Sequence, residues 1–247
     1  MTLRWWKSIW EKATMSLQVE TINVFYGQLH IIRNLSLSVA KGELVCIFGS
    51  NGHGKSTLLK AVCGLIKSQS GSVTFEGKNI TNHRVWEIVK RGIAYIPEDR
   101  NLFSGMTVME NLMLGAYLSK ARPKAEENLR TIFHLFPRLE ERKKQIVSTL
   151  SGGELRMLAV GRGLMTGADC LLIDEPSIGL SPLLKTEMYN VIKRINERGQ
   201  CTIVLVEQDV KEAKWLADRV YLLKHGEFVF EGRKDDLSED LIKKAFL

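Results

Sequence analysis

The sequence contains no hydrophobic run long enough to cross a lipid bilayer. A membrane-spanning helix needs about 20 consecutive apolar residues, whereas the longest candidates here are short segments such as CLLI and TIVLV. If the protein works at a membrane, other polypeptides must supply the membrane-spanning segments. The length of 247 residues suits one large domain, or a domain with a subdomain.

Cysteine is scarce as well. The four cysteines are far apart, lie among apolar neighbours and form no CxxC pair: Cys46, Cys63, Cys170 and Cys201. We therefore expect neither a disulfide framework nor a cysteine metal site. Isolated cysteines of this kind are typical of small core residues in a reducing cytosol.

Acidic residues are outnumbered, since 35 basic and 28 acidic side chains give a net charge of +7. A basic surplus can serve nucleic acid, an anionic membrane surface or anionic ligands. One local concentration of basic residues consists of Lys120, Arg122, Lys124, Arg138, Arg142, Lys143 and Lys144. It has no interleaved aromatic residues and no known reader motif, so we expect a solvated face and no nucleic-acid partner.

The first 15 residues form an N-terminal extension that is rich in tryptophan. Trp5, Trp6, Ile9, Trp10 and Ala13 share one helical face. The segment has neither the apolar core nor the cleavage site of a secretory signal. Three interpretations stay open: an amphipathic helix at a membrane interface, a helix that docks on a partner, or a start upstream of the true start at Met15.

Residues 16–247 predict an α/β domain. Residues 17–45 alternate apolar and polar side chains, which indicates antiparallel strands with one solvated face. Residues 41–49 then form a short, almost wholly apolar strand, followed by a helix over residues 55–65 and another short strand over residues 71–77. Residues 84–165 are mostly helical. Further strands alternate with helices that begin near Pro182 and Asp209, a pattern that predicts a parallel sheet. The predicted fold is therefore a parallel-sheet core with an antiparallel β-subdomain and an α-helical subdomain.

Two helix starts in this region carry capping boxes. Thr107 with Glu110, and Ser151 with Glu154, have the spacing at which two side chains satisfy backbone amides reciprocally. Ser181 before Pro182 gives a third helix a cap and the residue best tolerated at the first helical position.

A phosphate-binding loop follows the apolar strand. The segment GSNGHGKST matches glycine, four residues, then glycine, lysine and serine or threonine. Phosphates need many backbone amides around them, which explains the glycines, and the following helix start adds partial positive charge. We expect Lys55 to reach the β- and γ-phosphates, Ser56 to ligate Mg²⁺ and Thr57 to contact the α-phosphate. The predicted nucleotide-binding residues here are Gly49, Ser50, Asn51, Gly52, His53, Gly54, Lys55, Ser56 and Thr57.

A second strand supplies the acidic residues. DCLLIDE carries no charge along its apolar length and then presents Asp174 and Glu175 at its carboxyl end, where parallel sheets bind ligands. We expect Asp174 to hold Mg²⁺ through water. Glu175 is then the catalytic group that orients and deprotonates the attacking water.

The segment LSGGE, which lies between these two motifs, resembles the signature of the ATP-binding cassette ATPases. The resemblance extends over nearly the whole chain after Met15 and implies the fold of a phosphate-loop NTPase. It implies that Ser151, Gly152, Gly153 and Glu154 contact the γ-phosphate of a nucleotide held by a second cassette. Two cassettes would then close head-to-tail around two ATP molecules. Residues 177–182, SIGLSP, match the loop that crosses this interface.

The resemblance also assigns three further positions. Tyr26, in VFYGQ, matches the aromatic position that stacks on adenine. Glu98, in YIPED, stands where most cassettes have a glutamine that ligates Mg²⁺, and Gln208, in VEQDV, replaces a catalytic histidine. Glutamine cannot carry a proton and positive charge, which predicts slower or more partner-dependent hydrolysis.

The combination of IPEDR, LSGGE with MLAVGR, EPSIGLSP and LVEQ is similar to the LivF-type cassettes of branched-chain amino acid importers. Because this group normally carries Glu98 and Gln208, the resemblance implies intact hydrolysis. His53, usually alanine, and Leu155 with Arg156, usually two glutamines, are less typical. His53 either hydrogen-bonds a phosphate or faces solvent, and we favour solvent.

This resemblance implies a subunit that binds and hydrolyses ATP with Mg²⁺ and drives import of branched-chain amino acids, urea or short amides. Implied partners are a second cassette, identical or different, transmembrane permease subunits and, indirectly, a substrate-binding protein. The implied location is the cytoplasmic face of the cell membrane, with residues 84–165 as the link to the permease and residues 98–106 as its contact. The alternatives are a cassette of a lipid or drug exporter, and a non-transport cassette acting on ribosomes or DNA.

Overall fold

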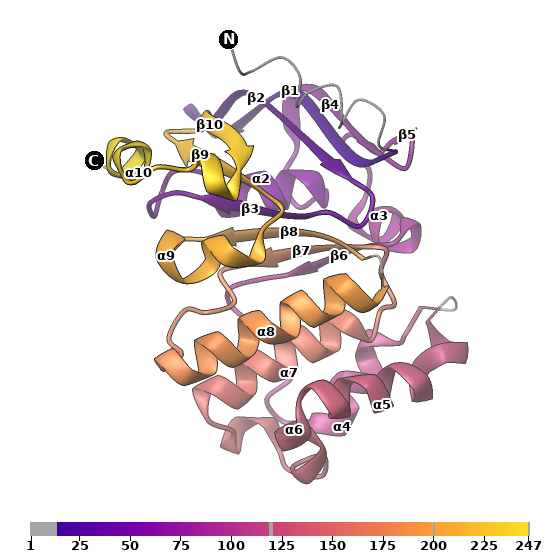
Figure 1. Ribbon diagram of the computed structural model, residues 1–247. Coiled ribbons are helices and arrows are strands. Elements are labelled where there is room, and N and C mark those ends of the chain that lie inside the picture. The colour runs from indigo at the N-terminus through magenta and orange to yellow at the C-terminus, as the bar shows by residue number, and fades with distance from the viewer. Residues whose placement is uncertain (1–13, 119–120, 200, 247) are drawn as a thin grey trace.

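The computed structural model of the chain describes residues 14–118, 121–199 and 201–246 (Figure 1). Of the tryptophan-rich extension predicted over residues 1–15, residues 1–13 lie outside the described residues, and Met15 already begins the first strand. The strands are β1 Met15–Tyr26, β2 Leu29–Ala40, β3 Leu44–Phe48, β4 Ser68–Phe75, β5 Lys78–Asn79, β6 Ile93–Ile96, β7 Cys170–Asp174, β8 Thr202–Glu207, β9 Arg219–Lys224 and β10 Glu227–Arg233.

Helices connect and cover these strands. The α-helices are α2 Lys55–Val62, α3 Val85–Arg91, α4 Val108–Gly115, α5 Ala125–Leu135, α6 Pro137–Glu141, α7 Gly152–Leu164, α8 Pro182–Gly199, α9 Val210–Ala213 and α10 Glu239–Phe246. Short 3₁₀ turns are η1 Arg122–Lys124, η2 Val147–Thr149, η3 Lys214–Leu216 and η4 Lys234–Asp236. No helix in these described ranges is both long and apolar enough to cross a membrane.

The central sheet has the strand order β10-β9-β3-β8-β7-β6. Its strands pair in parallel, except that β10 runs antiparallel to β9. Alternate residues of β3 enter two different cores: Val45 and Ile47 face one, while Leu44, Cys46 and Phe48 face the other. Because both faces are covered, the strand reads as a continuous apolar run, and the expected doubly buried strand is confirmed.

The two cores lie on opposite sides of this sheet (Figure 1). Above it in Figure 1 are α2 and a second, antiparallel sheet with the order β2-β1-β4-β5. Below it are α7 and α8, with α4, α5 and α6 farther from the sheet. The predicted α/β core with an antiparallel sheet and a helical region is therefore confirmed. All four cysteines are buried and free, as expected.

The ends of the helices and strands agree with the sequence prediction, with two differences. The capping boxes at Thr107 and Ser151 form, and α8 begins at Pro182. The helix after the phosphate loop ends at Val62, short of the expected Leu65. Gly64 adopts φ +76°, and a Cβ there would meet the carbonyl of His83 at 2.4 Å, so a left-handed glycine ends the helix.

The second difference concerns β4, which begins at Ser68 and ends at Phe75, whereas the sequence predicted a strand over residues 71–77. Its first residues pair with β1: Asn23 lies opposite Ser70, and Val24 opposite Ser68. Pairing across the sheet therefore extends the strand into residues that carry little strand signal of their own.

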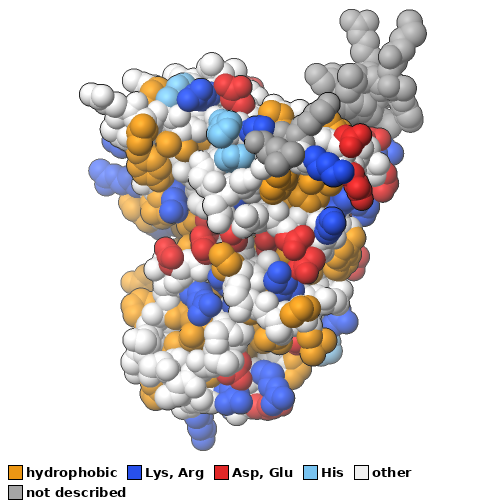
Figure 2. Space-filling view, turned by 90° about the vertical axis from the view of Figure 1, so that its left-hand side faces the viewer, with side chains coloured by type: hydrophobic (Ala, Val, Ile, Leu, Met, Phe, Trp, Pro, Cys, Tyr) orange, Lys and Arg blue, Asp and Glu red, His pale blue; other side chains and the backbone are white. Residues whose placement is uncertain are grey.

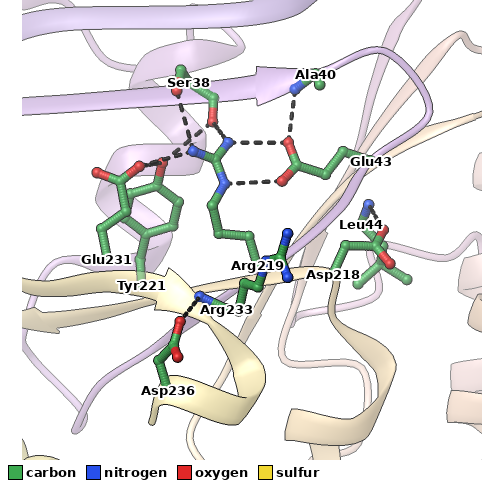
Figure 3. Close-up of polar contacts among 10 residues, drawn as sticks. All are labelled: Ser38, Ala40, Glu43, Leu44, Asp218, Arg219, Tyr221, Glu231, Arg233 and Asp236. Atoms are coloured by element: carbon green, nitrogen blue, oxygen red, sulfur yellow. Dashed lines mark hydrogen bonds and ion pairs between the residues drawn. The ribbon is translucent and has the colours of Figure 1, made fainter. Parts of the chain in front are cut away.

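A buried guanidinium joins the two sheets. Arg219, at the start of β9, places Nε 2.9 Å from Glu43 Oε1 and Nη1 2.8 Å from Glu231 Oε1 (Figure 3). Its Nη2 also donates to the carbonyl of Ser38 on β2. Both Arg219 and Glu43 are almost fully buried. The network fixes the antiparallel sheet against the edge of the parallel sheet, at the end remote from the phosphate loop.

Candidate nucleotide-binding and catalytic site

The phosphate-binding loop lies between β3 and α2, where close packing leaves no room for side chains at two glycines. A Cβ at Gly49 would meet the carbonyl oxygen of Leu223 at 2.5 Å, and one at Gly54 would meet Ile32 Cδ1 at 2.8 Å. Gly54 also has φ +103° and is the N-cap of α2, without a side-chain cap. The first amides of α2 are therefore free of side-chain acceptors and suited to an anion.

Lys55 folds back across this loop and is only 4% exposed. Its ammonium donates to the carbonyl oxygens of Gly49 at 2.7 Å and Ser50 at 3.2 Å. It also forms a 2.9 Å ion pair with Oε1 of Glu175. The structure therefore brings the predicted phosphate-binding lysine and the predicted base into direct contact.

Asp174 ends β7 beside the loop. The hydroxyl of Ser56 donates to Asp174 Oδ1 at 3.0 Å, and the hydroxyl of Tyr95 donates to Oδ2 at 2.7 Å. Burial raises the pKa of Asp174 although both hydrogen bonds oppose that shift. A buried carboxylate next to a serine hydroxyl supplies the hard oxygen donors that Mg²⁺ prefers.

These residues fit a magnesium ion that is shared with phosphates. Within the described ranges, no group of three or more His, Cys, Asp or Glu side chains could hold a metal ion by itself. Mg²⁺ is usually held by one or two carboxylates together with substrate phosphates and water. Ser56 and Asp174 match that donor set, and Glu98 lies on the same hollow as Ser56.

Glu175 leaves β7 in a left-handed conformation with φ +44°, and its amide donates to the carbonyl of Val206 at 3.0 Å. It borders two hollows. One, of about 370 Å³, is also lined by Asn51, Gly52, Gly54, Lys55, Ser56, Thr57, Glu98 and Ile31. The other, of about 500 Å³, is also lined by Gln208, Ser177 and the C-terminal residues Ile242 and Phe246. The predicted base therefore lies between the phosphate loop and Gln208.

Both positions that depart from the general cassette pattern lie at these hollows. Burial raises the pKa of Glu98, and the nearby charges of Glu175 and Asp174 act in the same direction. Gln208 is exposed at the end of β8. Figure 2 shows acidic side chains gathered across the middle of this side of the molecule, between the β-rich part and the helices. A divalent cation would offset that concentration of negative charge.

The signature segment lies elsewhere. Ser151 and Gly152 are exposed at the start of α7, whereas Gly153 is buried. Glu154 Oε2 accepts from the amide and the hydroxyl of Ser151, both at 2.9 Å, and its Oε1 lies 2.6 Å from Arg142 Nε. No residue of the signature is among those that line the two hollows. Ser151 is thus exposed and does not line the hollow at its own phosphate loop.

Two predicted nucleotide contacts are placed differently from the rest. Tyr26 ends β1, is 47% exposed and is not among the residues lining the hollow at Lys55, so its stacking stays a prediction. His53 is partly buried and its Nδ1 lies 3.2 Å from the carbonyl of Leu223. Its ring also packs on His225 at 4.7 Å between centroids. We expected the His53 ring to face solvent, and this holds only in part because the ring also contacts protein atoms.

Three residues at this site were not singled out from the sequence for a role in it. Tyr95 hydrogen-bonds Asp174. Glu207, buried at the end of β8, accepts from the amides of Ser177 at 3.2 Å and Gln208 at 3.3 Å. Arg156 donates to the carbonyl of Glu98 at 2.8 Å. Each is a polar residue inside an otherwise apolar run, which is the signal that could have identified it.

Comparisons with known proteins agree with this geometry. A family model described as "ABC transporter" matches residues 32–178. The high-affinity branched-chain amino acid transport ATP-binding protein BraG of Pseudomonas aeruginosa is 39% identical over 213 residues, covering 86% of this chain and 91% of that protein. The probable branched-chain amino acid transport ATP-binding protein LivF of Archaeoglobus fulgidus is 36% identical over 223 residues, covering 90% and 94%.

Solved structures are similar over the same range. The ADP conformation of MJ1267, an ATP-binding cassette of an ABC transporter, superposes with a TM-score of 0.77 at 30% identity, covering 93% of this chain and 94% of that one. A dimeric post-hydrolysis state of the cassette MJ0796, bound to ADP and Pi, gives a TM-score of 0.76 at 25% identity, covering 88% and 98%.

Proposed function

The chain belongs to the ABC transporter family, and from this premise we propose that it is the ATP-hydrolysing subunit of an importer for branched-chain amino acids or a related small polar solute such as urea or a short amide. The observation that carries the proposal is the convergence of Lys55, Asp174 and Glu175 on one glycine-lined loop. The cargo class rests on the names of the two relatives.

ATP binding draws on the loop amides and on Lys55. The phosphate oxygens accept hydrogen bonds from the backbone amides at the start of α2. The γ-phosphate competes with Glu175 for the Lys55 ammonium. Mg²⁺, held by Ser56 and, through water, by Asp174, with Glu98 beside it, would neutralise developing charge on the phosphates. Glu175, released from Lys55, then orients and deprotonates water for in-line attack, so positioning and electrostatics carry most of the catalysis.

A second cassette completes the site. Ser151 and Gly152 are exposed at the start of α7, and Ser151 is the N-cap of that helix. An outward anion site that does not reach its own phosphate loop is of use to a nucleotide held by another subunit. We propose a head-to-tail dimer in which residues 177–182 cross the interface. The dimeric MJ0796 structure with ADP and Pi supports the formation of a dimer.

The permease partner is expected at a hollow of about 490 Å³ between β6, α4 and α7. Phe103 and Tyr117 line it and are 55% and 72% exposed, which is high for aromatic side chains. Its lining residues include Pro97 and Asn101, on either side of Glu98 in the chain, so a helix bound there would respond to changes at the proposed magnesium site. We propose that a cytoplasmic segment of the permease binds it. The protein would then lie at the cytoplasmic face of the membrane, with residues 84–165 as the transmitting subdomain.

Reconstitution tests the proposal. The chain is purified with permeases and a binding protein from neighbouring genes, placed in liposomes, and assayed for ATP-dependent uptake of leucine, isoleucine, valine, urea and acetamide. Lys55→Met should abolish nucleotide binding and uptake, while Lys67→Met, at an exposed lysine outside the loop, should leave both unchanged. Uptake that is equally fast in both variants, or a wild-type chain that binds no ATP, would refute the proposal. Co-purification with ribosomes or DNA would favour the non-transport alternative.

A further inference from the structure

Arg156 is a buried cation on the helix that carries the signature at its start. It is only 1% exposed, and it lies on α7 one turn beyond Ser151. Its Nη1 donates to the carbonyl oxygen of Glu98 at 2.8 Å, and its Nε has no hydrogen-bond partner. In the described part of the chain, no carboxylate lies within ion-pair distance of it. Burying a guanidinium without a carboxylate partner costs free energy of folding. We therefore expect the charge to have a role.

Three carboxylates lie beyond ion-pair distance of Arg156 but near enough to affect its pKa. Burial lowers the pKa of Arg156, as does the charge of Arg100, while the charges of Glu98, Glu207 and Asp174 oppose that shift. The influence is mutual at Glu98, whose pKa Arg156 acts to lower against the effect of burial. Arg156 therefore lies behind the acidic edge of the sheet, close enough to favour ionised carboxylates there.

A second arginine of α7 holds the same segment. Arg162 donates to the carbonyl of Arg100 at 3.0 Å, and its guanidinium lies 5.9 Å from the ring centroid of Phe103. The backbone after β6 is thus fixed to α7 at two carbonyls, those of Glu98 and Arg100. Because Arg100 and Asn101 have positive φ, this segment is a tight, non-repetitive turn with few backbone partners of its own.

We propose that Arg156 is a positioning residue for the magnesium site: by binding the Glu98 carbonyl from α7, it sets the place of the Glu98 carboxylate beside Ser56 and keeps a compensating positive charge behind it. This inference rests on the proposed function, because Glu98 matters only if MgATP is bound. A shorter, neutral side chain would hold the carbonyl less firmly and would supply no charge.

The test compares metal binding with nucleotide binding. Arg156→Met removes the donor and the charge at similar volume, Arg156→Gln keeps an amide donor, and Arg138→Met, at an exposed arginine, is the matched control. Each protein is loaded with ADP and titrated with Mn²⁺ by electron paramagnetic resonance. ATP affinity without metal and the Mg²⁺ dependence of hydrolysis are measured in parallel.

We expect Arg156→Met to weaken Mn²⁺ binding and to raise the Mg²⁺ concentration for half-maximal hydrolysis by about tenfold, the effect typical of outer-shell partners. Arg156→Gln should show a smaller loss, and Arg138→Met none. Metal-free ATP affinity should stay within about twofold of the wild type. Normal Mn²⁺ binding in both Arg156 variants, or a parallel loss of metal-free ATP affinity, would overturn the inference while leaving the proposed function intact. A wild-type chain that binds no nucleotide would overturn both.

Discussion

The ammonium of Lys55 and the carboxylate of Glu175 form an ion pair of 2.9 Å inside the phosphate-binding site, with both side chains less than 8% exposed. In the proposed function, Lys55 binds the transferred phosphate and Glu175 activates water, so the ion pair neutralises both charges while no phosphate is bound. A phosphate that binds Lys55 would replace this carboxylate. Nucleotide binding would then also release the proposed base.

The ion pair predicts opposite effects on binding and turnover when Glu175 is changed to glutamine. Glu175→Gln removes the carboxylate that competes with phosphate for Lys55, so ATP should bind several-fold more tightly. Loss of the base should lower hydrolysis by at least about a hundredfold and leave a closed, ATP-bound dimer. Fluorescent-nucleotide titration, phosphate release and size-exclusion chromatography measure the three effects. Glu187→Gln, at an exposed glutamate of α8, is the control, and normal hydrolysis by Glu175→Gln would show that another group is the base.

Replacing Gln208 with histidine should change how the rate of ATP hydrolysis depends on pH. Gln208 borders the hollow beside Glu175 and does not titrate, whereas histidine changes charge near pH 6.5. The variant Gln208→His should therefore change turnover and introduce a step in the pH–rate profile between about pH 5.5 and 7.5. Gln208→Ala should lower turnover with little change in ATP affinity. Equal rates and profiles in all three proteins would exclude a rate-limiting role for Gln208.

Replacing Asp174 with asparagine should stabilise the folded chain, and the gain should depend on pH. Burial raises its pKa in the folded chain above the unfolded value of 3.8, so the folded state holds the proton more tightly. The cost of the buried charge is absent below the unfolded pKa, grows as pH rises through the window between the two values, and is complete above it. Asp174→Asn should therefore raise Tm at pH 8 by about 2–4 °C for each kcal/mol removed, and by progressively less as the pH is lowered toward 3.8. Thermal denaturation without nucleotide over this pH range measures the gain, and a gain that does not shrink as the pH falls would contradict the prediction.

Replacing Arg219, which lies away from the proposed catalytic site, should destabilise the folded chain. Arg219→Met leaves Glu43 buried without its cation, which typically costs about 3–5 kcal/mol. Replacing both partners, as in Arg219→Met with Glu43→Leu, should recover most of that loss because no uncompensated charge stays buried. Urea denaturation measures both effects. Arg233→Met, an exposed change on β10, should lie within about 0.5 kcal/mol of the wild type, and a double variant as unstable as the single one would disprove the pairing.

Much of the site could be predicted because its chemistry depends on short, contiguous patterns. The glycine spacing around Lys55, the acidic pair that ends an apolar strand, and the Ser151–Glu154 capping box each specify local geometry. The structure brings Lys55, Ser56, Glu98, Asp174 and Glu175 together as expected. It leaves the stacking role of Tyr26 as a prediction, and it gives His53 protein contacts instead of full exposure.

The residues that the sequence did not reveal act across long separations. Tyr95 meets Asp174 from another strand, Arg156 meets Glu98 from another helix, and Arg219 meets Glu43 across 176 positions. No period or spacing encodes such pairs, because they depend on which elements pack side by side.

The sequence by itself determined the phosphate loop, the acidic strand end, the signature cap and the alternation that produces a parallel sheet. These follow from hydrogen bonding and burial within a few neighbouring residues. Only the tertiary structure decided that Lys55 is paired with Glu175, and that α7 holds the segment of Glu98 through Arg156. Those contacts arise when the sheet and helices pack together, since burial forces each charged group to find a partner wherever the fold brings one within reach.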